Sequence, residues 1–119
     1  MNKEIMKGSI DILLLSQIAR RDMYGFEIVK ELQLKSNNIY KMSEGTLYPA
    51  LQRLEQKMCV CSYWENSDAG GRRKYYKITD LGMEKLIKKM DEWKQVSELI
   101  HSCKEELNWI DLENTSMQF

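Results

Sequence analysis

The residues best suited to binding chemistry form one short run, Gly70, Gly71, Arg72, Arg73 and Lys74. Two adjacent glycines allow the tight bend of a hairpin tip and let the backbone lie close to a partner. Three consecutive cations can pair with phosphates, and one arginine could enter a minor groove. The same run could equally be a solvated turn with ordinary surface charge. Its interpretation therefore depends on the elements around it.

A second polar set lies between residues 43 and 57, where Leu47, Leu51 and Leu54 recur at helical spacing and predict a buried helix face. Short polar groups near a helix N-terminus can donate to phosphate or reach base edges. The candidates on the rest of this helix are Ser43, Glu44, Thr46, Tyr48, Gln52 and Arg53.

Each of these candidates has an alternative role. Tyr48 could pack against the preceding helix, and Arg53 could pair with Glu55. Tyr24 and Lys30, in the preceding helix, could touch flanking phosphates, although tyrosine at a helix start is more often a packing residue.

The single proline, Pro49, suits only the first turn of a helix. This predicts either that Thr46 is the true cap or that the helix starts irregularly at Ser43.

The elements that would position these residues are three helices, a hairpin and a long final helix. Apolar spacing predicts the first helix over residues 9–19. Ser9 can cap its N-terminus, but we expect the helix to start upstream, near Glu4. The second covers residues 24–36 and stops at Asn37 and Asn38, because asparagine tolerates the left-handed conformation. Strands over 60–65 and 73–79 flank the glycine run, and Thr79 or Asp80 caps the last helix. This order predicts a mainly α fold with a small β-hairpin, a winged helix-turn-helix.

The last helix carries a continuous apolar stripe about six turns long, which suits pairing with a second copy. If two such helices pair about a two-fold axis, Trp93 with Met90 and Val96 could form a slot for a planar aromatic ligand. Trp93 could instead simply fill the interface or pack on the first helix. The predicted dimer interface comprises Leu86, Met90, Trp93, Val96, Ile100, Cys103 and Leu107.

Charge and composition exclude several classes of protein. Residues 1–80 carry 13 Lys and Arg against 10 Asp and Glu, and residues 81–119 carry 5 against 8, so the net charges are +3 and −3. This asymmetry suits a DNA-facing half. There is no apolar run long enough for a membrane span or signal peptide, which predicts a cytoplasmic protein. One histidine and no phosphate-binding loop argue against an enzyme and predict no cofactor.

The three cysteines, Cys59, Cys61 and Cys103, are predicted to be reduced, and buried or half-buried. Cys59 and Cys61 would share a face of a strand. His101 and Cys103, two apart on a helix, point away from each other and cannot easily chelate a metal together. No metal site is therefore predicted, and a thiol- or metal-responsive regulator stays an alternative.

Five ordered motifs make the chain resemble the PadR family of bacterial transcriptional regulators. The resemblance covers roughly residues 5–105, with Met58 and Cys59 where family members usually have glycine. It implies a homodimeric repressor of the short form, with a single C-terminal dimerisation helix, similar to the multidrug-responsive members. The motifs are YGFEI at 24–28, EGTLYPAL at 44–51, RLE at 53–55, GGRRKYY at 70–76 and ITDLG at 78–82.

Together these observations predict a DNA-binding domain over residues 1–80, a dimerisation helix over 81–107 and a tail over 108–119 that need not be ordered. The expected function is transcriptional repression at a pseudo-palindromic operator, with release by a small planar hydrophobic or cationic ligand. The expected partners are double-stranded DNA, a second copy and a small aromatic effector, with no membrane. The alternative is a winged-helix module for protein–protein contact.

Overall fold

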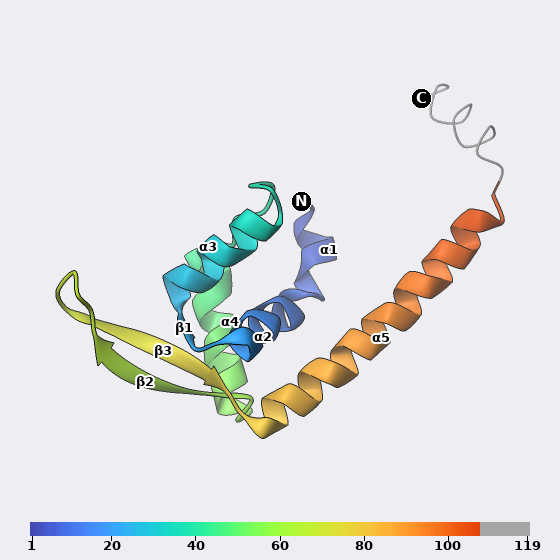
Figure 1. Ribbon diagram of the computed structural model, residues 1–119. Helices are drawn as coiled ribbons and strands as arrows, with labels where there is room; N and C mark the ends of the chain where they lie inside the picture. The colour runs from blue at the N-terminus through green and yellow to red at the C-terminus, as the bar shows by residue number, and fades with distance from the viewer. Residues whose placement is uncertain (108–119) are drawn as a thin grey trace. The chain divides into compact units, whose positions relative to one another are not determined.

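The computed structural model describes residues 1–107 as five helices and three short strands (Figure 1). Met1–Ile87 form one compact unit, here called the head, and a second unit begins at Lys88. No helix of the described part is both long and apolar enough to cross a membrane. In chain order the elements are α1 Lys3–Lys7, α2 Ile10–Arg20, β1 Met23–Tyr24, α3 Gly25–Lys35, α4 Glu44–Gln56, β2 Val60–Asn66, β3 Arg72–Ile78 and α5 Asp80–Glu105.

The N-terminal region contains two helices where the sequence predicted one. Asn2 caps α1 by accepting hydrogen bonds from the backbone N–H groups of Glu4 at 2.8 Å and Ile5 at 3.3 Å. Gly8 ends α1, and α2 begins after Ser9, whose side chain makes no capping bond. The helix predicted over residues 9–19 is confirmed as α2, with Ser9 at its N-cap position. The predicted start upstream near Glu4 was wrong, because those residues form a separate helix that Asn2 caps and Gly8 ends.

Helices α3 and α4 both end in a left-handed turn. Asn37 and Asn38 have φ of 54° and 65°, as their side-chain type predicted. After α4, the N–H groups of Met58 and Cys59 donate to the carbonyls of Glu55 at 3.0 Å and Leu54 at 2.8 Å. Met58 has φ of 62°, so it adopts the conformation for which glycine is usual, at a cost of about 1 kcal/mol. The helix therefore ends in a left-handed turn although no glycine is present there.

Pro49 lies inside α4 and not in its first turn. Ser43 is the cap, since its side chain accepts from the N–H of Thr46 at 3.3 Å. Thr46 is helical, so the prediction that it is the cap was wrong, whereas the start at Ser43 is confirmed. Because proline has no N–H, the carbonyl of Gly45 receives no bond from this residue, and the helix continues with one bond fewer.

The sheet has three antiparallel strands in the order β1-β3-β2, so the predicted hairpin gains a strand. Strand β1 is only two residues long and pairs Met23 with Tyr76 and Tyr24 with Tyr75. Strands β2 and β3 pair from Val60–Ile78 to Asn66–Arg72. Beyond β1 they extend away from the helices as a two-stranded wing, which we define as residues 60–78 (Figure 1).

The head's core lies between α2, α3, α4 and the sheet, and it also takes in the start of α5. Gly82 and Leu86 are the buried residues of α5, and the exposed fraction of Leu86 is 4%. Leu86, predicted at a dimer interface, is thus covered by its own head. The compact unit accordingly extends to Ile87 and not to residue 80.

The remaining apolar stripe of α5 is exposed in the single chain. Trp93 is 53% exposed and Ile100 is 62% exposed, and the other stripe members are similarly open to solvent. The predicted tail, residues 108–119, lies outside the described residues. The exposed members of the predicted interface are Met90, Trp93, Val96, Ile100, Cys103 and Leu107.

Candidate nucleic-acid interface

Helix α4 presents a broad exposed arc to solvent, because its apolar residues occupy only one side. Leu47, Ala50, Leu51 and Leu54 are buried. At 3.6 residues per turn, the other residues follow one another around the arc. One edge carries Tyr48 and Glu55, the middle carries Gln52, Gly45 and Gln56, and the other edge carries Pro49, Arg53 and Thr46.

The first edge of α4 borders a hollow that we call the wing-side groove. Its volume is about 650 Å³, and both aromatic and charged side chains line it. It brings together three residues of the glycine–cation run and residues of α4, two sets that the sequence singled out separately. The lining residues are Tyr24, Gly25, Tyr48, Gln52, Glu55, Trp64, Arg72, Arg73, Lys74 and Tyr76.

All three consecutive cations line the wing-side groove, but they project from two faces of the strand, because successive side chains of a strand point to opposite faces. Arg72 and Lys74 lie on one face, opposite Asn66 and Trp64. Arg73 lies on the other face, opposite Glu65. The wing therefore carries cations on both sides. Gly70 and Gly71, with φ of 94° and 77°, form the tip between the strands.

Two of the cations are held over aromatic rings on the face toward α4. The guanidinium carbon of Arg72 lies 5.1 Å from the ring centroid of Trp64, and Trp64 is 54% exposed. The Lys74 ammonium lies 5.6 Å from the ring centroid of Tyr76. Such contacts restrict the long side chains before any partner arrives. Trp64 was not predicted as a site residue. The available signal was its position in the strand, which places it on the opposite face from Cys61 and Tyr63.

Glu55 connects α4 to the wing. Its carboxylate lies 3.8 Å from the Lys74 ammonium nitrogen, and its other oxygen accepts a hydrogen bond from the Ser62 hydroxyl. The alternative in which Arg53 pairs with Glu55 was wrong, because Arg53 lies on the opposite edge of the arc. Lys74 is therefore already partly neutralised, and its ion pair links the wing to α4.

On the other wing face, Arg73 belongs to a cluster of tyrosines. Its guanidinium carbon lies 4.5 Å from the ring centroid of Tyr24, which meets Tyr75 edge-on at 5.5 Å. Tyr63 stacks on Tyr75 at 5.7 Å and donates a 2.5 Å hydrogen bond to Asp22. That hydrogen bond raises the pKa of Tyr63 to about 12, because Asp22 accepts from the protonated form of the hydroxyl. The cluster fixes this face of the wing.

Tyr48 packs against the preceding helix, as one of its two predicted roles requires, and it also remains accessible. A Cβ at Gly25 would lie 2.7 Å from the Tyr48 hydroxyl oxygen, so the tyrosine rests directly on the backbone at the start of α3. Tyr48 is nevertheless 45% exposed. Gly25 thus determines where the phenol lies in the wing-side groove.

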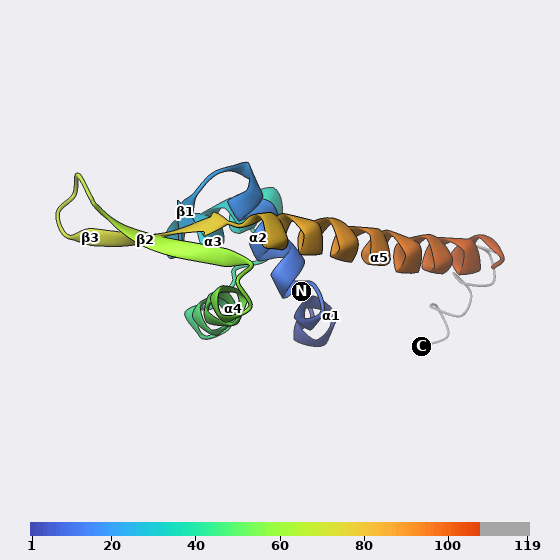
Figure 2. The same ribbon diagram turned by 90° about the horizontal axis from the view of Figure 1, so that it is seen from below.

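The second edge of α4 borders another hollow, which we call the α1-side cleft. Its volume is about 400 Å³, and it lies between α1 and the first turns of α4. Figure 2 shows α1 and α4 on the same side of the head. Four cations line this cleft: Lys3, Lys7, Lys41 and Arg53.

The two hollows account for most of the predicted site residues. Ser43, Thr46 and Arg53 line the α1-side cleft, while Tyr24, Tyr48 and Gln52 line the wing-side groove. Glu44 is the exposed first residue of α4, and Lys30 is exposed on α3 but lines neither hollow. Residues that the sequence did not single out are Glu55, Gln56, Trp64, Lys3, Lys7 and Lys41.

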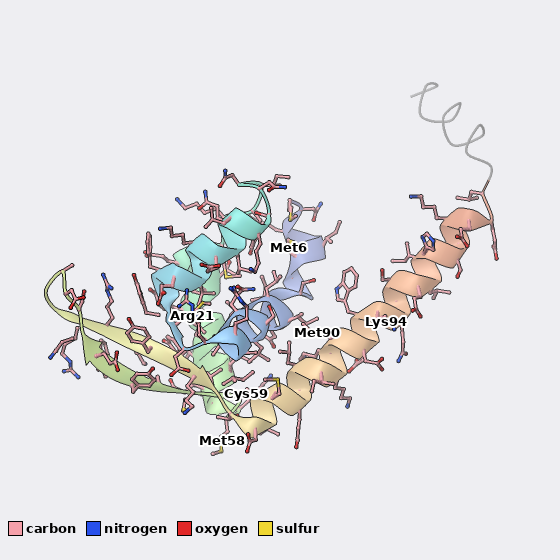
Figure 3. All side chains as sticks on the ribbon, in the orientation of Figure 1. Met6, Arg21, Met58, Cys59, Met90 and Lys94 are labelled. Atoms are coloured by element: carbon pink, nitrogen blue, oxygen red, sulfur yellow. The ribbon has the colours of Figure 1, made fainter. Side chains whose placement is uncertain are left out.

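The cysteines differ from the sequence expectation. Cys59 lies in the turn before β2 and is buried, whereas Cys61 and Cys103 are exposed, so the prediction that all three are covered was wrong. Figure 3 labels Cys59 and its neighbour Met58, which is 71% exposed. Within residues 1–107, no group of three metal-ligating side chains comes together.

Comparison with known proteins agrees with this architecture. The model of the transcriptional regulator PadR-like family matches residues 14–88. A Lysinibacillus sphaericus protein called protein X is 40% identical over 97 residues, which cover 82% of this chain and 89% of that protein.

Two solved structures illustrate the similarity of the fold. A transcriptional regulator from Clostridium thermocellum is 32% identical, with a TM-score of 0.78 over 86% of this chain and 96% of that one. A PadR-like transcriptional regulator from Bacillus cereus is 30% identical, with a TM-score of 0.74 over 85% and 96%. The matched residues include α4 and the whole wing. The chain therefore belongs to the PadR-like family of transcriptional regulators.

Proposed function

We propose that this regulator is a repressor that binds a pseudo-palindromic operator as a homodimer. The observation that carries the proposal is the exposed arc of α4 beside a wing with cations on both faces. A helix of this diameter fits the major groove, which is about 12 Å wide. A protein-binding wing would have little reason to expose Arg72 and Arg73 together.

In this arrangement the middle of the α4 arc faces the bases. Gln52 and Gln56 occupy that position, and a glutamine can bind adenine through two hydrogen bonds. The wing lies beside the helix, with Arg72 and Arg73 directed to opposite sides. A hairpin entering a minor groove with this geometry meets the phosphates of both strands.

The test is a mobility-shift assay with the DNA upstream of the protein's own gene, repeated over a range of salt concentrations. We expect a shift that weakens steeply with salt and that survives competition by unrelated duplex. No shift at low salt, on either the upstream DNA or a random-sequence pool, would refute DNA binding. The alternative, a winged-helix module for protein contact, would then be favoured.

We assign the dimer interface to the stripe formed by Met90, Trp93, Val96 and Ile100. All four are large apolar side chains of α5 that remain at least 45% exposed in the single chain. Covering such a stripe removes apolar area from water, and a second copy carries the matching stripe. Trp93 near its symmetry mate would bind a planar aromatic ligand, whose entry changes the spacing of the two heads and releases the operator.

Trp93→Glu is expected to convert the dimer to monomer, because two carboxylates would be buried in an apolar interface. The dissociation constant of the dimer should rise about 100-fold or more, which sedimentation at several protein concentrations can measure. The control is Ser102→Glu, which adds the same charge on the opposite side of the helix. A Trp93→Glu variant as dimeric as the control would contradict the assigned interface.

A further inference from the structure

We infer that the α1-side cleft is a second binding site for the sugar-phosphate backbone of DNA, on the side of α4 away from the wing. This inference rests on the proposed DNA binding. It specifies which residues bind the second of the two sugar-phosphate strands that border the major groove. The residues that carry it are Lys3 and Lys7 of α1, Lys41 before α4 and Arg53 on α4.

The positive charges around this cleft outnumber the negative ones. Within residues 1–107, none of the four cations forms an ion pair. By contrast, Arg20, Arg21 and Lys74 are all paired with glutamates. Glu4 is the one carboxylate in the lining. The cleft therefore keeps an excess of positive charge, which favours an anionic partner.

Two of the α4 residues that line the cleft, Gly45 and Pro49, carry little side-chain bulk. Gly45, Pro49 and Arg53 follow one another at intervals of four residues, so they share one side of the helix. Only the Ser43 hydroxyl oxygen, at 3.9 Å, lies near the position of a Cβ on Gly45. A glycine and a ring without an N–H leave room for a bulky backbone to approach closely.

The geometry of a major-groove helix requires a contact on this side. A helix that fills the groove has one sugar-phosphate strand along each flank. The wing-side groove serves the strand next to Tyr48 and Glu55, and the α1-side cleft lies on the opposite flank of the same helix. The short helix α1 thus brings its lysines to the second sugar-phosphate strand of the duplex. These contacts add affinity for any DNA sequence and fix the position of the protein on the duplex, but they do not read the bases.

The experiment measures duplex binding by fluorescence anisotropy as a function of salt for the full chain. Lys3→Ala/Lys7→Ala is expected to weaken binding at least about 10-fold near 0.15 M salt and to reduce the salt slope by about 2 to 4, at roughly 0.9 per lost phosphate contact in a dimer. The loss should be similar on operator and unrelated duplex, since phosphates carry no sequence. Because α1 has no buried residues, the substitution of its two lysines should leave the thermal unfolding midpoint of the protein unchanged.

Two further variants complete the test. Lys3→Arg/Lys7→Arg keeps the charges and should keep the parent's salt slope. Lys85→Ala/Lys88→Ala removes two lysines of α5 that line neither hollow, and it should behave like the parent. If the parent binds duplex but Lys3→Ala/Lys7→Ala matches this control, the inference is overturned while the proposed function stands. If the parent binds no duplex, both fall.

Discussion

Gly82→Ala is expected to destabilise the head by about 3 kcal/mol or more, because there is no room for a Cβ. An added Cβ would lie 2.0 Å from the carbonyl oxygen of Cys59 and 2.9 Å from a side-chain carbon of Ile78. The nearest obstacle is backbone and cannot rotate away. The Thr79 hydroxyl holds the start of α5 close to the turn before β2. It accepts a hydrogen bond from the Gly82 N–H at 3.0 Å and donates one to the Met58 carbonyl at 2.6 Å.

Thermal unfolding followed by circular dichroism, at one fixed protein concentration, checks this expectation. For a unit of this size the midpoint should fall by about 12 °C or more. Gly8→Ala is the matched control, because nothing lies within 4 Å of its Cβ position and its φ of −75° suits alanine. A Gly82→Ala variant that unfolds at the temperature of this control would show that α5 can shift away from Cys59 at little cost.

Arg72→Ala/Arg73→Ala is expected to lower operator affinity about 100- to 1,000-fold at moderate salt, because a dimer loses four cations. The salt slope should fall by about 3 to 4. Both single variants should contribute, since the two arginines lie on opposite faces of the wing. Lys74→Ala should cost less, because Glu55 already holds its ammonium group at 3.8 Å.

The same duplex and salt series provide the measurement, with Lys85→Ala/Lys88→Ala as the control of equal charge. The wing should stay folded, since its register depends on backbone pairing and on the tyrosine cluster. Equal binding by the double variant and this control would remove the wing from the interface. A loss confined to Arg72→Ala would mean that only one face of the wing meets DNA.

The sequence was sufficient for the elements with long repeating patterns. The limits of α3 and α4 follow from leucine spacing and from Asn37 and Asn38, and both strands of the wing were predicted within a residue or so. Strand β1 could not be predicted, because two residues have no period. It forms only since the free edge of β3 offers backbone partners to Met23 and Tyr24.

The candidate site was predicted in its residue types but not in its pairings. The cation run and the polar residues of α4 were visible, yet the register alone determines that Arg73 faces away from Arg72. The contact between Glu55 and Lys74 joins residues far apart in the chain, so local spacing could not reveal it. The α1-side cleft was missed for the same reason, since α1 and α4 meet only in the folded head.

The alternation of cations along β3 also limits how the wing can change in evolution. If the end of β3 in the core stays in place, a deletion of one residue after Arg73 would turn Arg72 and Arg73 to opposite faces and would exchange the partners of Trp64 and Tyr24. Insertions or deletions at the tip, residues 67–71, leave the pairing from Asn66–Arg72 onward intact. Related wings can therefore vary freely in length at the tip, whereas their strands can lengthen or shorten only two residues at a time.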